Sequence, residues 1–306
     1  MAPRTLGVLL IVVSATAFGA LPIFARLAYA GGGDVTAVLF LRFAIAAVAM
    51  AAVLVVRRRP WPRPRLFVAL LLMGGVGYVG QSFAYFTALT LIPATLVSLL
   101  LYAYPALVVL LAVLWLGERL TTVKTAALGI ALVGAALTIG PELGGRRLGI
   151  VLGLSAAAIY AVYIVVGSRI TPRAGPLPSA AVVMLGATAV YAVVVLVQRP
   201  AFPGSVGGWA AVLGLSLVST VVAITTFFAG MDRLGAADTS TLSTLEPLVT
   251  VVLAAIVLDE RVTAVQLTGG VLILAAVLLL ARATPGSGRR VPAFTPADPT
   301  SGYPPT

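Results

Sequence analysis

The chain has 306 residues, of which 60% are apolar and only 9% are charged, and its formal net charge is +11. A water-soluble domain carries about 25% charged residues, so this composition excludes a soluble globule and indicates an integral membrane protein. Cys and His are both absent, which excludes disulfides, Cys or His metal sites and His-dependent catalysis. The same apolar excess argues against a nucleic-acid partner despite the positive charge.

Polar and turn-forming residues divide the chain into ten apolar segments, each close to the roughly 20 residues that a membrane-spanning helix needs. The predicted spans are 6–28, 35–56, 66–88, 93–116, 123–140, 148–168, 177–198, 209–231, 237–258 and 263–281. None of them shows the alternation of apolar and polar residues that a barrel strand requires. The sequence therefore predicts an all-α integral membrane protein with ten transmembrane helices, surrounded by the lipid bilayer.

The two ends of the chain need separate treatment. The span 6–28 could also be a signal peptide, because Arg4 precedes an apolar stretch that ends in small residues. It has a counterpart in the repeat described below, so we expect it to be retained. The segment 283–306 is rich in Pro, Gly, Ser and Thr, and it is predicted to be a disordered cytoplasmic tail.

The basic residues concentrate in alternate connections between the spans. With the N-terminus inside the cell, the inner segments hold 14 of the 20 Lys and Arg residues: Arg4, Arg57, Arg58, Arg59, Arg63, Arg65, Arg119, Lys124, Arg169, Arg173, Arg233, Arg282, Arg289 and Arg290. Cytoplasmic loops carry such an excess, so we expect a multi-pass protein of the plasma membrane with both termini in the cytoplasm. The positive charge then lies beside anionic headgroups.

The two halves of the chain match when one is shifted by 142 residues without a gap. Pro105 then coincides with Pro247, and the Glu-Arg pair at 118–119 coincides with that at 260–261. Such a match of Pro, Glu and Arg is far harder to obtain by chance than a match of Ala and Leu. We therefore predict two five-helix repeats, 1–142 and 143–282. Because five is odd, the second repeat is inverted relative to the first, as in many secondary transporters.

Both repeats also resemble a known family. The segments Ala94–Thr121 and Glu246–Thr263 are similar to the ends of EamA domains, and the Leu-Arg-Phe sequence at 41–43 is similar to the second span of that family. EamA proteins belong to the drug/metabolite transporter superfamily. The resemblance implies ten helices and the export or uptake of small metabolites such as amino acids, nucleosides or drugs. Asp259 in place of Gly117 departs from the repeated pattern.

Pro105 and Pro247 interrupt the fourth and ninth spans. A proline removes one helical hydrogen bond and frees the carbonyl four residues earlier, here those of Leu101 and Ser243. An unpaired carbonyl is costly in lipid, so these two groups must face protein, water or a substrate. We interpret the prolines as helix kinks that line a central cavity, with simple packing kinks as the alternative.

Glu246 and Arg42 are charged residues that lie well inside predicted spans, away from the span ends. A charge at the membrane centre costs roughly 3 kcal/mol and usually faces a cavity or a partner. We hypothesise that Glu246 binds a substrate amine or couples transport to protons, and the alternative is a structural acid paired with Arg26 or Arg42. Arg42 is a candidate for binding a substrate carboxylate, and contact with lipid headgroups is its alternative.

A further group of polar and aromatic residues lies either too centrally for an interfacial belt or on shared helical faces. We predict that these residues contribute to a substrate pocket with hydroxyl and amide groups. They are Gln81, Tyr85, Tyr102, Tyr104, Tyr160 and Tyr163.

Glu118 and Glu260 follow the fourth and ninth spans, on opposite sides of the membrane in the predicted topology. They are candidates for gates, and turn salt bridges or helix caps are the alternative. Thr263 and Gln266 fit a capping box, in which each side chain bonds the backbone N–H of the other residue.

These features favour a secondary transporter, more specifically an exporter, of small organic metabolites such as amino acids, amines or drugs, which works by alternating access. A membrane-embedded enzyme or a channel is the alternative, but the acidic residues are scattered and nothing resembles a nucleotide-binding loop. We expect no enzymatic activity, no cofactor and no metal ion. A small-molecule substrate is the expected partner, protons are a candidate coupling ion, and the sequence leaves the oligomeric state open.

Overall fold

The computed structural model describes residues 3–116, 121–139 and 147–283, and every regular element in these ranges is helical. Glu118 and all but the first residue of the predicted tail lie outside the described residues. The all-α prediction is therefore confirmed for the part of the chain that the structure covers.

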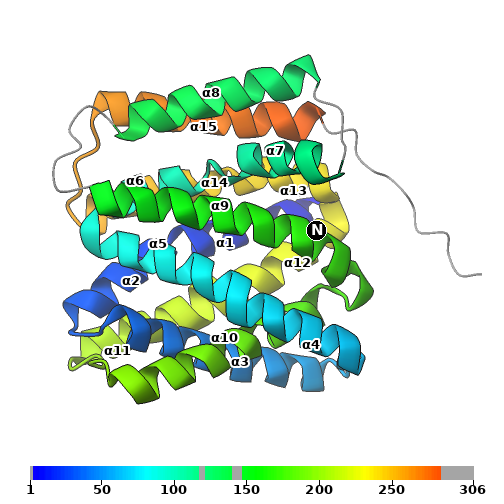
Figure 1. Cartoon of the computed structure of the whole chain (residues 1–306), viewed down its shortest axis with the longest axis vertical. Coiled ribbons are helices and arrows are strands. Elements are labelled where there is room, and N and C mark those ends of the chain that lie inside the picture. Colours follow the sequence, from blue (N-terminus) through cyan, green and yellow to red (C-terminus); the bar gives the residue numbers. More distant parts are fainter. Residues whose placement is uncertain (1–2, 117–120, 140–146, 284–306) are drawn as a thin grey trace, which may run out of the picture.

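Ten spans follow one another in two sets of five (Figure 1). The first set consists of α1 (Pro3–Gly19) with α2 (Leu21–Ala30), α3 (Val35–Val56), α4 (Pro64–Leu72) with η1 (Met73–Tyr78) and α5 (Val79–Leu91), α6 (Ala94–Leu101) with α7 (Tyr104–Leu116), and α8 (Thr122–Ile139). The second set consists of α9 (Arg147–Ile170), which runs into the short η3 (Thr171–Arg173), then α10 (Pro176–Gln198), α11 (Val206–Leu213) with η4 (Gly214–Val222) and α12 (Ala223–Leu234), α13 (Ala236–Ser243) with α14 (Leu245–Val257), and α15 (Ala264–Ala283).

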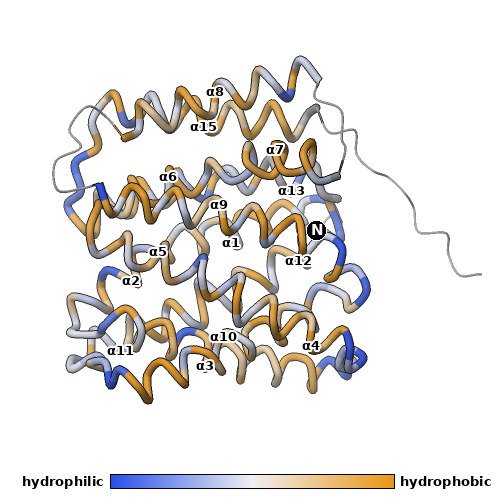
Figure 2. The backbone as a smooth tube through the Cα atoms, viewed as in Figure 1, coloured by the Kyte–Doolittle hydropathy of each residue, from blue (hydrophilic) through white to orange (hydrophobic). Residues whose placement is uncertain are grey.

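The helices are built for lipid rather than water. In the described chain nine of the spans are long and apolar enough to cross a membrane, and the remaining one contains the shorter apolar helix α14. Large aliphatic side chains point outward, among them Val48 with 72%, Val56 with 81% and Leu196 with 76% of their surface exposed. Figure 2 shows the helices as mainly hydrophobic, with hydrophilic residues gathered at the two ends of the bundle. Such exposed apolar surface is stable only against acyl chains.

The packing follows the inverted repeat. Helices in equivalent positions of the two repeats pack against each other: α3 against α10 at one edge of the molecule, and α8 against α15 at the opposite edge (Figure 1). Equivalent pairs also recur, since α1 packs against α12 just as α9 packs against α5. The architecture of this protein is thus ten membrane-spanning helices, some of them interrupted, in two inverted repeats of five spans.

Several spans are interrupted within the membrane. The fourth span breaks at Tyr102 and Ala103, shortly before Pro105, and the ninth breaks at Thr244, shortly before Pro247, which confirms the predicted kinks. The π-helical turns η1 and η4, which occupy matching positions in the third and eighth spans, were not predicted. Wider π turns are rare and frequently accompany functional sites.

The predicted capping box is also confirmed. The Thr263 N–H donates to Gln266 Oε1 at 3.1 Å, and the Gln266 N–H donates to Thr263 Oγ1 at 3.2 Å. These two bonds satisfy donors at the start of α15 that have no partner inside the helix.

The two ends of the bundle differ. We call the end with Arg4 and the start of α4 the N-terminal face, and the other end the far face. On the far face the loop after α2 closes against the loop before α11: the Asp34 N–H donates to the Ala201 carbonyl at 2.9 Å, and the Ala201 N–H donates to Asp34 Oδ2 at 2.7 Å. This seal needs glycine, because a Cβ on Gly31 would lie 2.5 Å from the Gly208 Cα.

On the N-terminal face the equivalent segments stand apart. The segments 59–66 and 173–176 correspond by the 142-residue shift to 201–208 and 31–34. A crevice of about 960 Å³ lies here, lined by residues of 60–69 and 170–174. The described structure therefore holds these loops together on the far face and leaves a crevice between their counterparts on the N-terminal face.

Candidate functional site

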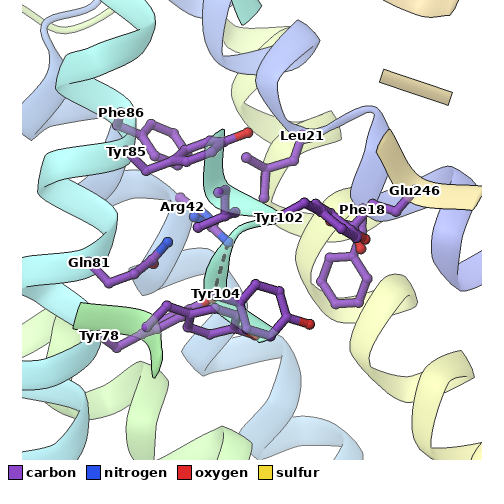
Figure 3. Close-up of a pocket in the computed structure, with 12 residues that line it drawn as sticks. Phe18, Leu21, Arg42, Tyr78, Gln81, Tyr85, Phe86, Tyr102, Tyr104 and Glu246 are labelled. Atoms are coloured by element: carbon purple, nitrogen blue, oxygen red, sulfur yellow. Dashed lines mark hydrogen bonds between the residues drawn. The ribbon is translucent and has the colours of Figure 1, made fainter. Parts of the chain in front are cut away.

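A pocket lies inside the bundle where α1, α3, α5, α9 and α14 meet the breaks of the fourth and ninth spans (Figure 3). It is lined by Phe18, Leu21, Arg42, Tyr78, Gln81, Tyr85, Phe86, Leu101, Tyr102, Tyr104, Tyr160 and Glu246. Its volume is about 100 Å³. Sites for small organic ligands usually measure roughly 300–1,000 Å³, so the side chains have to move apart to admit a solute of that kind.

Arg42 on α3 supplies the positive charge of the pocket, with only 3% of its surface exposed. Its Nε donates to Thr220 Oγ1 at 3.1 Å, and one terminal nitrogen donates to the Tyr78 hydroxyl at 3.4 Å. The guanidinium carbon also lies 5.1 Å and 5.2 Å from the ring centres of Phe43 and Phe86. Hydrogen bonds and ring faces thus stabilise a buried cation that pairs with no carboxylate among the described residues.

The two π-helical turns position the partners of Arg42. Tyr78 ends η1 and Thr220 lies in η4, and the two residues coincide under the 142-residue shift. The Thr220 hydroxyl donates to the Leu215 carbonyl, five residues earlier, at 2.9 Å, a spacing that suits a π-helical turn. A single arginine therefore bridges equivalent points of both repeats.

Glu246 supplies the acidic group of the pocket, on the side away from Arg42 (Figure 3). It is the second residue of α14, and a carboxylate in the first turn interacts favourably with the positive end of the helix dipole. Neither Arg26 nor Arg42 forms an ion pair with it, so the predicted structural pairing is not observed. Arg26 instead donates to the Leu89 carbonyl at 2.6 Å.

The Ser243 carbonyl, which Pro247 leaves without its helical donor, accepts a hydrogen bond from another helix break. The Tyr102 hydroxyl, from the break in the fourth span, donates to the Ser243 carbonyl at 3.1 Å. The expectation that this carbonyl faces a protein partner is confirmed, and the partner comes from the other repeat. The bond ties the two helix breaks together directly beside Glu246.

Five tyrosines connect the two charged groups in a continuous series of ring contacts. The ring centres are 6.0 Å apart for Tyr102 and Tyr104, 4.8 Å for Tyr104 and Tyr160, and 6.0 Å for Tyr160 and Tyr163. The rings of Tyr163 and Tyr78 follow at 5.5 Å, and Tyr78 accepts the hydrogen bond from Arg42. The series forms an aromatic wall with hydroxyl groups, suited to an amphipathic ligand.

The remaining wall comes from α5. Gln81 extends its amide toward the pocket, and Tyr85 and Phe86 line it from the same helix (Figure 3). Gln81 and Tyr85 are four residues apart, which places them on one face of α5 as predicted.

Seven of the eight residues predicted for substrate binding or coupling thus line one pocket, and Tyr163 lies behind it, against Tyr160 and Tyr78. Their role as a binding site stays a prediction. Five further residues line the pocket and were not predicted from the sequence: Phe18, Leu21, Tyr78, Phe86 and Leu101. A usable signal did exist, because Phe18 is the repeat counterpart of the predicted Tyr160.

Glu260, one of the two proposed gates, lies away from the pocket and caps a helix of the other repeat. Its two carboxylate oxygens accept the backbone N–H groups of Ala94 at 2.6 Å and Thr95 at 3.0 Å, at the start of α6. The capping alternative therefore describes its contacts, and the cap joins the repeats at the far face. The other proposed gate, Glu118, lies outside the described residues.

Across the described ranges, no group of three or more Asp and Glu side chains could hold a metal ion.

Comparison with known proteins identifies the family of the chain. The EamA-like transporter family matches residues 5–140 and again residues 147–282. The chain belongs to this family. Members of the family are transporters, so the pocket lies in a membrane transport protein.

Individual relatives agree with this assignment. The chain is 30% identical over 268 residues to a "Probable terminal-alkyne amino-acid exporter" of Streptantibioticus cattleyicolor, covering 83% of this chain and 86% of the relative. It is 28% identical over 228 residues to a "Probable amino-acid metabolite efflux pump" of Escherichia coli, covering 69% and 76%. A crystal structure with 23% identity superposes with a TM-score of 0.62 over 90% of this chain and 97% of the other, which shows a shared fold.

Proposed function

We propose that this EamA-family transporter exports amino acids or closely related zwitterions across the plasma membrane by alternating access. The observation that carries the proposal is that Arg42 and Glu246 line the same pocket, and that neither has an ion-pair partner among the described residues. Burying two charges of opposite sign apart from each other is costly in a membrane. A ligand with both charges would neutralise them together.

The chemistry of each end fits an amino acid. A guanidinium has five N–H donors, and Arg42 uses one on Thr220 and one on Tyr78, which leaves roughly three for a substrate carboxylate. Glu246 can accept the ammonium group. The tyrosines between the two charges offer ring faces to a side chain of moderate size. The names of the two relatives support the same class of substrate.

Glu246 also provides a basis for proton coupling. A carboxylate can hold a substrate ammonium or a proton, but a single site does not hold both at once. Outward movement of the amino acid could therefore alternate with inward movement of a proton through the same residue. This assignment extends the substrate proposal, and the pH dependence of transport tests it separately.

The seal on the far face supports access to the pocket from the N-terminal face in this conformation. By the distribution of basic residues the N-terminal face is the cytoplasmic one. This conformation would receive its substrate from the cytoplasm, and the inverted repeats supply a related conformation that opens to the outside.

The test is counterflow in proteoliposomes that contain the purified protein. A series of amino acids is compared with the amines that lack the carboxylate and with the acids that lack the amino group. We expect saturable exchange of some amino acids, with both truncated analogues transported at least tenfold less efficiently. Equal transport of an amine and its amino acid would refute carboxylate recognition. Leak without saturation would indicate a channel, and chemical conversion of the solute would indicate an enzyme.

A further inference from the structure

The crevice on the N-terminal face is a second site with a different chemistry. It lies between the start of α4 and the end of α9, and Arg63, Arg65 and Arg173 line it together with Trp61. We propose that this crevice binds the headgroup of an anionic phospholipid. The proposal does not depend on the transported substrate, and it uses none of the residues of the central pocket.

The charge of the crevice calls for an anion. Neither 57–66 nor 169–175 contains Asp or Glu, and none of the three arginines pairs with a carboxylate among the described residues. All three arginines are exposed, and three like charges that line one crevice create a positive potential that attracts an anion. A phosphate diester matches the planar donor fork of arginine, which binds phosphate oxygens in pairs.

The start of α4 adds further donors. Arg63 is the N-cap residue of α4, and it provides no side-chain cap for the N–H groups of the first turn. In the other repeat the equivalent residue, Ser205, caps α11 by accepting the Gly208 N–H at 3.1 Å. Serine is a preferred N-cap residue, so an arginine at this position makes the helix less stable. Uncapped N–H groups beside arginines form a setting in which a phosphate is stabilised.

The walls of the crevice favour a lipid over free phosphate. Trp61 is 43% exposed and lies edge-on to Phe67, with ring centres 6.2 Å apart, in the manner of an aromatic residue at a membrane interface. Leu66, Ala69 and Ile170 line the crevice beside the arginines. A glycerophospholipid would place its phosphate among the arginines and its glycerol and upper acyl chains along this apolar wall.

Comparison between the repeats indicates that the crevice persists during transport. On the far face the equivalent loops close through Gly31 and Gly208, with no room for a Cβ on Gly31. Their counterparts on the N-terminal face are Arg173 and Leu66, whose side chains prevent an approach as close as that. Residual space with three arginines therefore remains for a headgroup when this face closes.

A simple topology signal would look different. The positive-inside rule requires only basic residues near the ends of the spans, without any particular arrangement. Here the arginines come from two separate connections and line one crevice together with a tryptophan. The equivalent loop of the far face, 199–207, folds with Arg199 as its only charged residue. The fold therefore does not need the arginines for packing.

Binding is measured on the purified full-length protein in a neutral detergent, by native mass spectrometry and by thermal unfolding, so that membrane orientation plays no role. The probes are dioleoyl phosphatidylglycerol, dioleoyl phosphatidylcholine and inorganic phosphate. We expect saturable binding of phosphatidylglycerol with a rise in melting temperature, and little effect of the other two. The variant R63Q/R65Q/R173Q should bind phosphatidylglycerol roughly 100-fold more weakly, since each arginine near an anionic lipid contributes a factor of about five.

The matched control is R199Q/R233Q/R261Q, which also loses three positive charges but leaves the crevice unchanged, and it should bind phosphatidylglycerol like the unmodified protein. Equal binding of phosphatidylglycerol and phosphatidylcholine, or an equal loss in both variants, would overturn the proposal. So would displacement of the lipid by millimolar inorganic phosphate, which would indicate a site for free phosphate. If the triple variant does not fold, Trp61→Ala replaces it and should weaken lipid binding without a change in charge.

Discussion

Replacing Arg42 by Met separates the functional role of this residue from its structural role. Met184 occupies the equivalent position of the second repeat, so the fold accepts methionine at this depth. The variant no longer buries a charge, which is worth roughly 3 kcal/mol at the centre of a membrane helix. It loses a charged hydrogen bond of 3.1 Å to Thr220, a longer one of 3.4 Å to Tyr78 and contacts with two aromatic rings, together worth about 3–5 kcal/mol.

These terms nearly cancel, so Arg42→Met should change the free energy of unfolding by no more than about 2 kcal/mol. Thr220 keeps its bond to the Leu215 carbonyl, which limits the disturbance to one side of the pocket. Binding should respond far more strongly. Removing the partner of a buried substrate carboxylate costs about 3 kcal/mol, or roughly 100-fold in affinity.

The assay compares an amino acid with its decarboxylated amine in proteoliposome counterflow, together with thermal unfolding of the purified variant. In the unmodified protein the amino acid should be strongly preferred, and Arg42→Met should abolish that preference by weakening only the amino acid. Arg26→Met is the control, because Arg26 binds the Leu89 carbonyl and does not line the pocket. It should lower stability and leave the preference intact. A well-folded Arg42→Met variant that still prefers the amino acid would refute the reasoning.

Three further predictions test other parts of the structure. Glu246→Gln should fold, lose the preference for an amino acid over its des-amino acid and flatten the pH profile of counterflow; an unchanged preference and profile would leave Glu246 with a structural role. Glu260→Gln keeps only one carboxamide oxygen for the two N–H groups of α6. We expect thermal unfolding to show about 1 kcal/mol lower stability, and a cysteine placed in the pocket to react faster with a reagent from the far side. Unchanged labelling would contradict a seal at this point. In intact cells a cysteine at Arg58 should be protected from an impermeant thiol reagent and one at Gly204, which has open space around it, should react; the reverse pattern would invert the topology.

The fold could be predicted from the sequence because a lipid bilayer permits few backbone structures. A chain in lipid has to satisfy its backbone hydrogen bonds within helices, so long apolar segments translate directly into spans. The match of Pro105 with Pro247 fixed the register of the repeats, and the structure breaks both helices near these positions. The π-helical turns η1 and η4 were missed, because no local pattern of residues specifies one extra residue per turn.

The pocket was predictable in part for the same reason. Charged and polar residues at mid-depth have to face inward, which selects Arg42, Glu246 and Gln81 without any knowledge of the packing. Their contacts depend on which helices become neighbours, and this information is not local. Nothing near Glu260 in the sequence indicates that its carboxylate caps α6, more than 160 residues away.

The two repeats share a fold but divide the chemistry unequally, and this inequality has a consequence for transport. Arg42 and Gln81 have Met184 and Ala223 as counterparts, and Tyr104 has Glu246, so ten of the twelve pocket residues come from the first repeat. A symmetric pocket would offer the same groups to a substrate in both conformations. Arg42 is held by Tyr78 of its own repeat and by Thr220 of the other, so a movement of one repeat against the other at this point has to stretch or break the bond to Thr220. A carboxylate bound to Arg42 would therefore sense the change between conformations, which is what a carrier needs if loading and release are to occur on different sides.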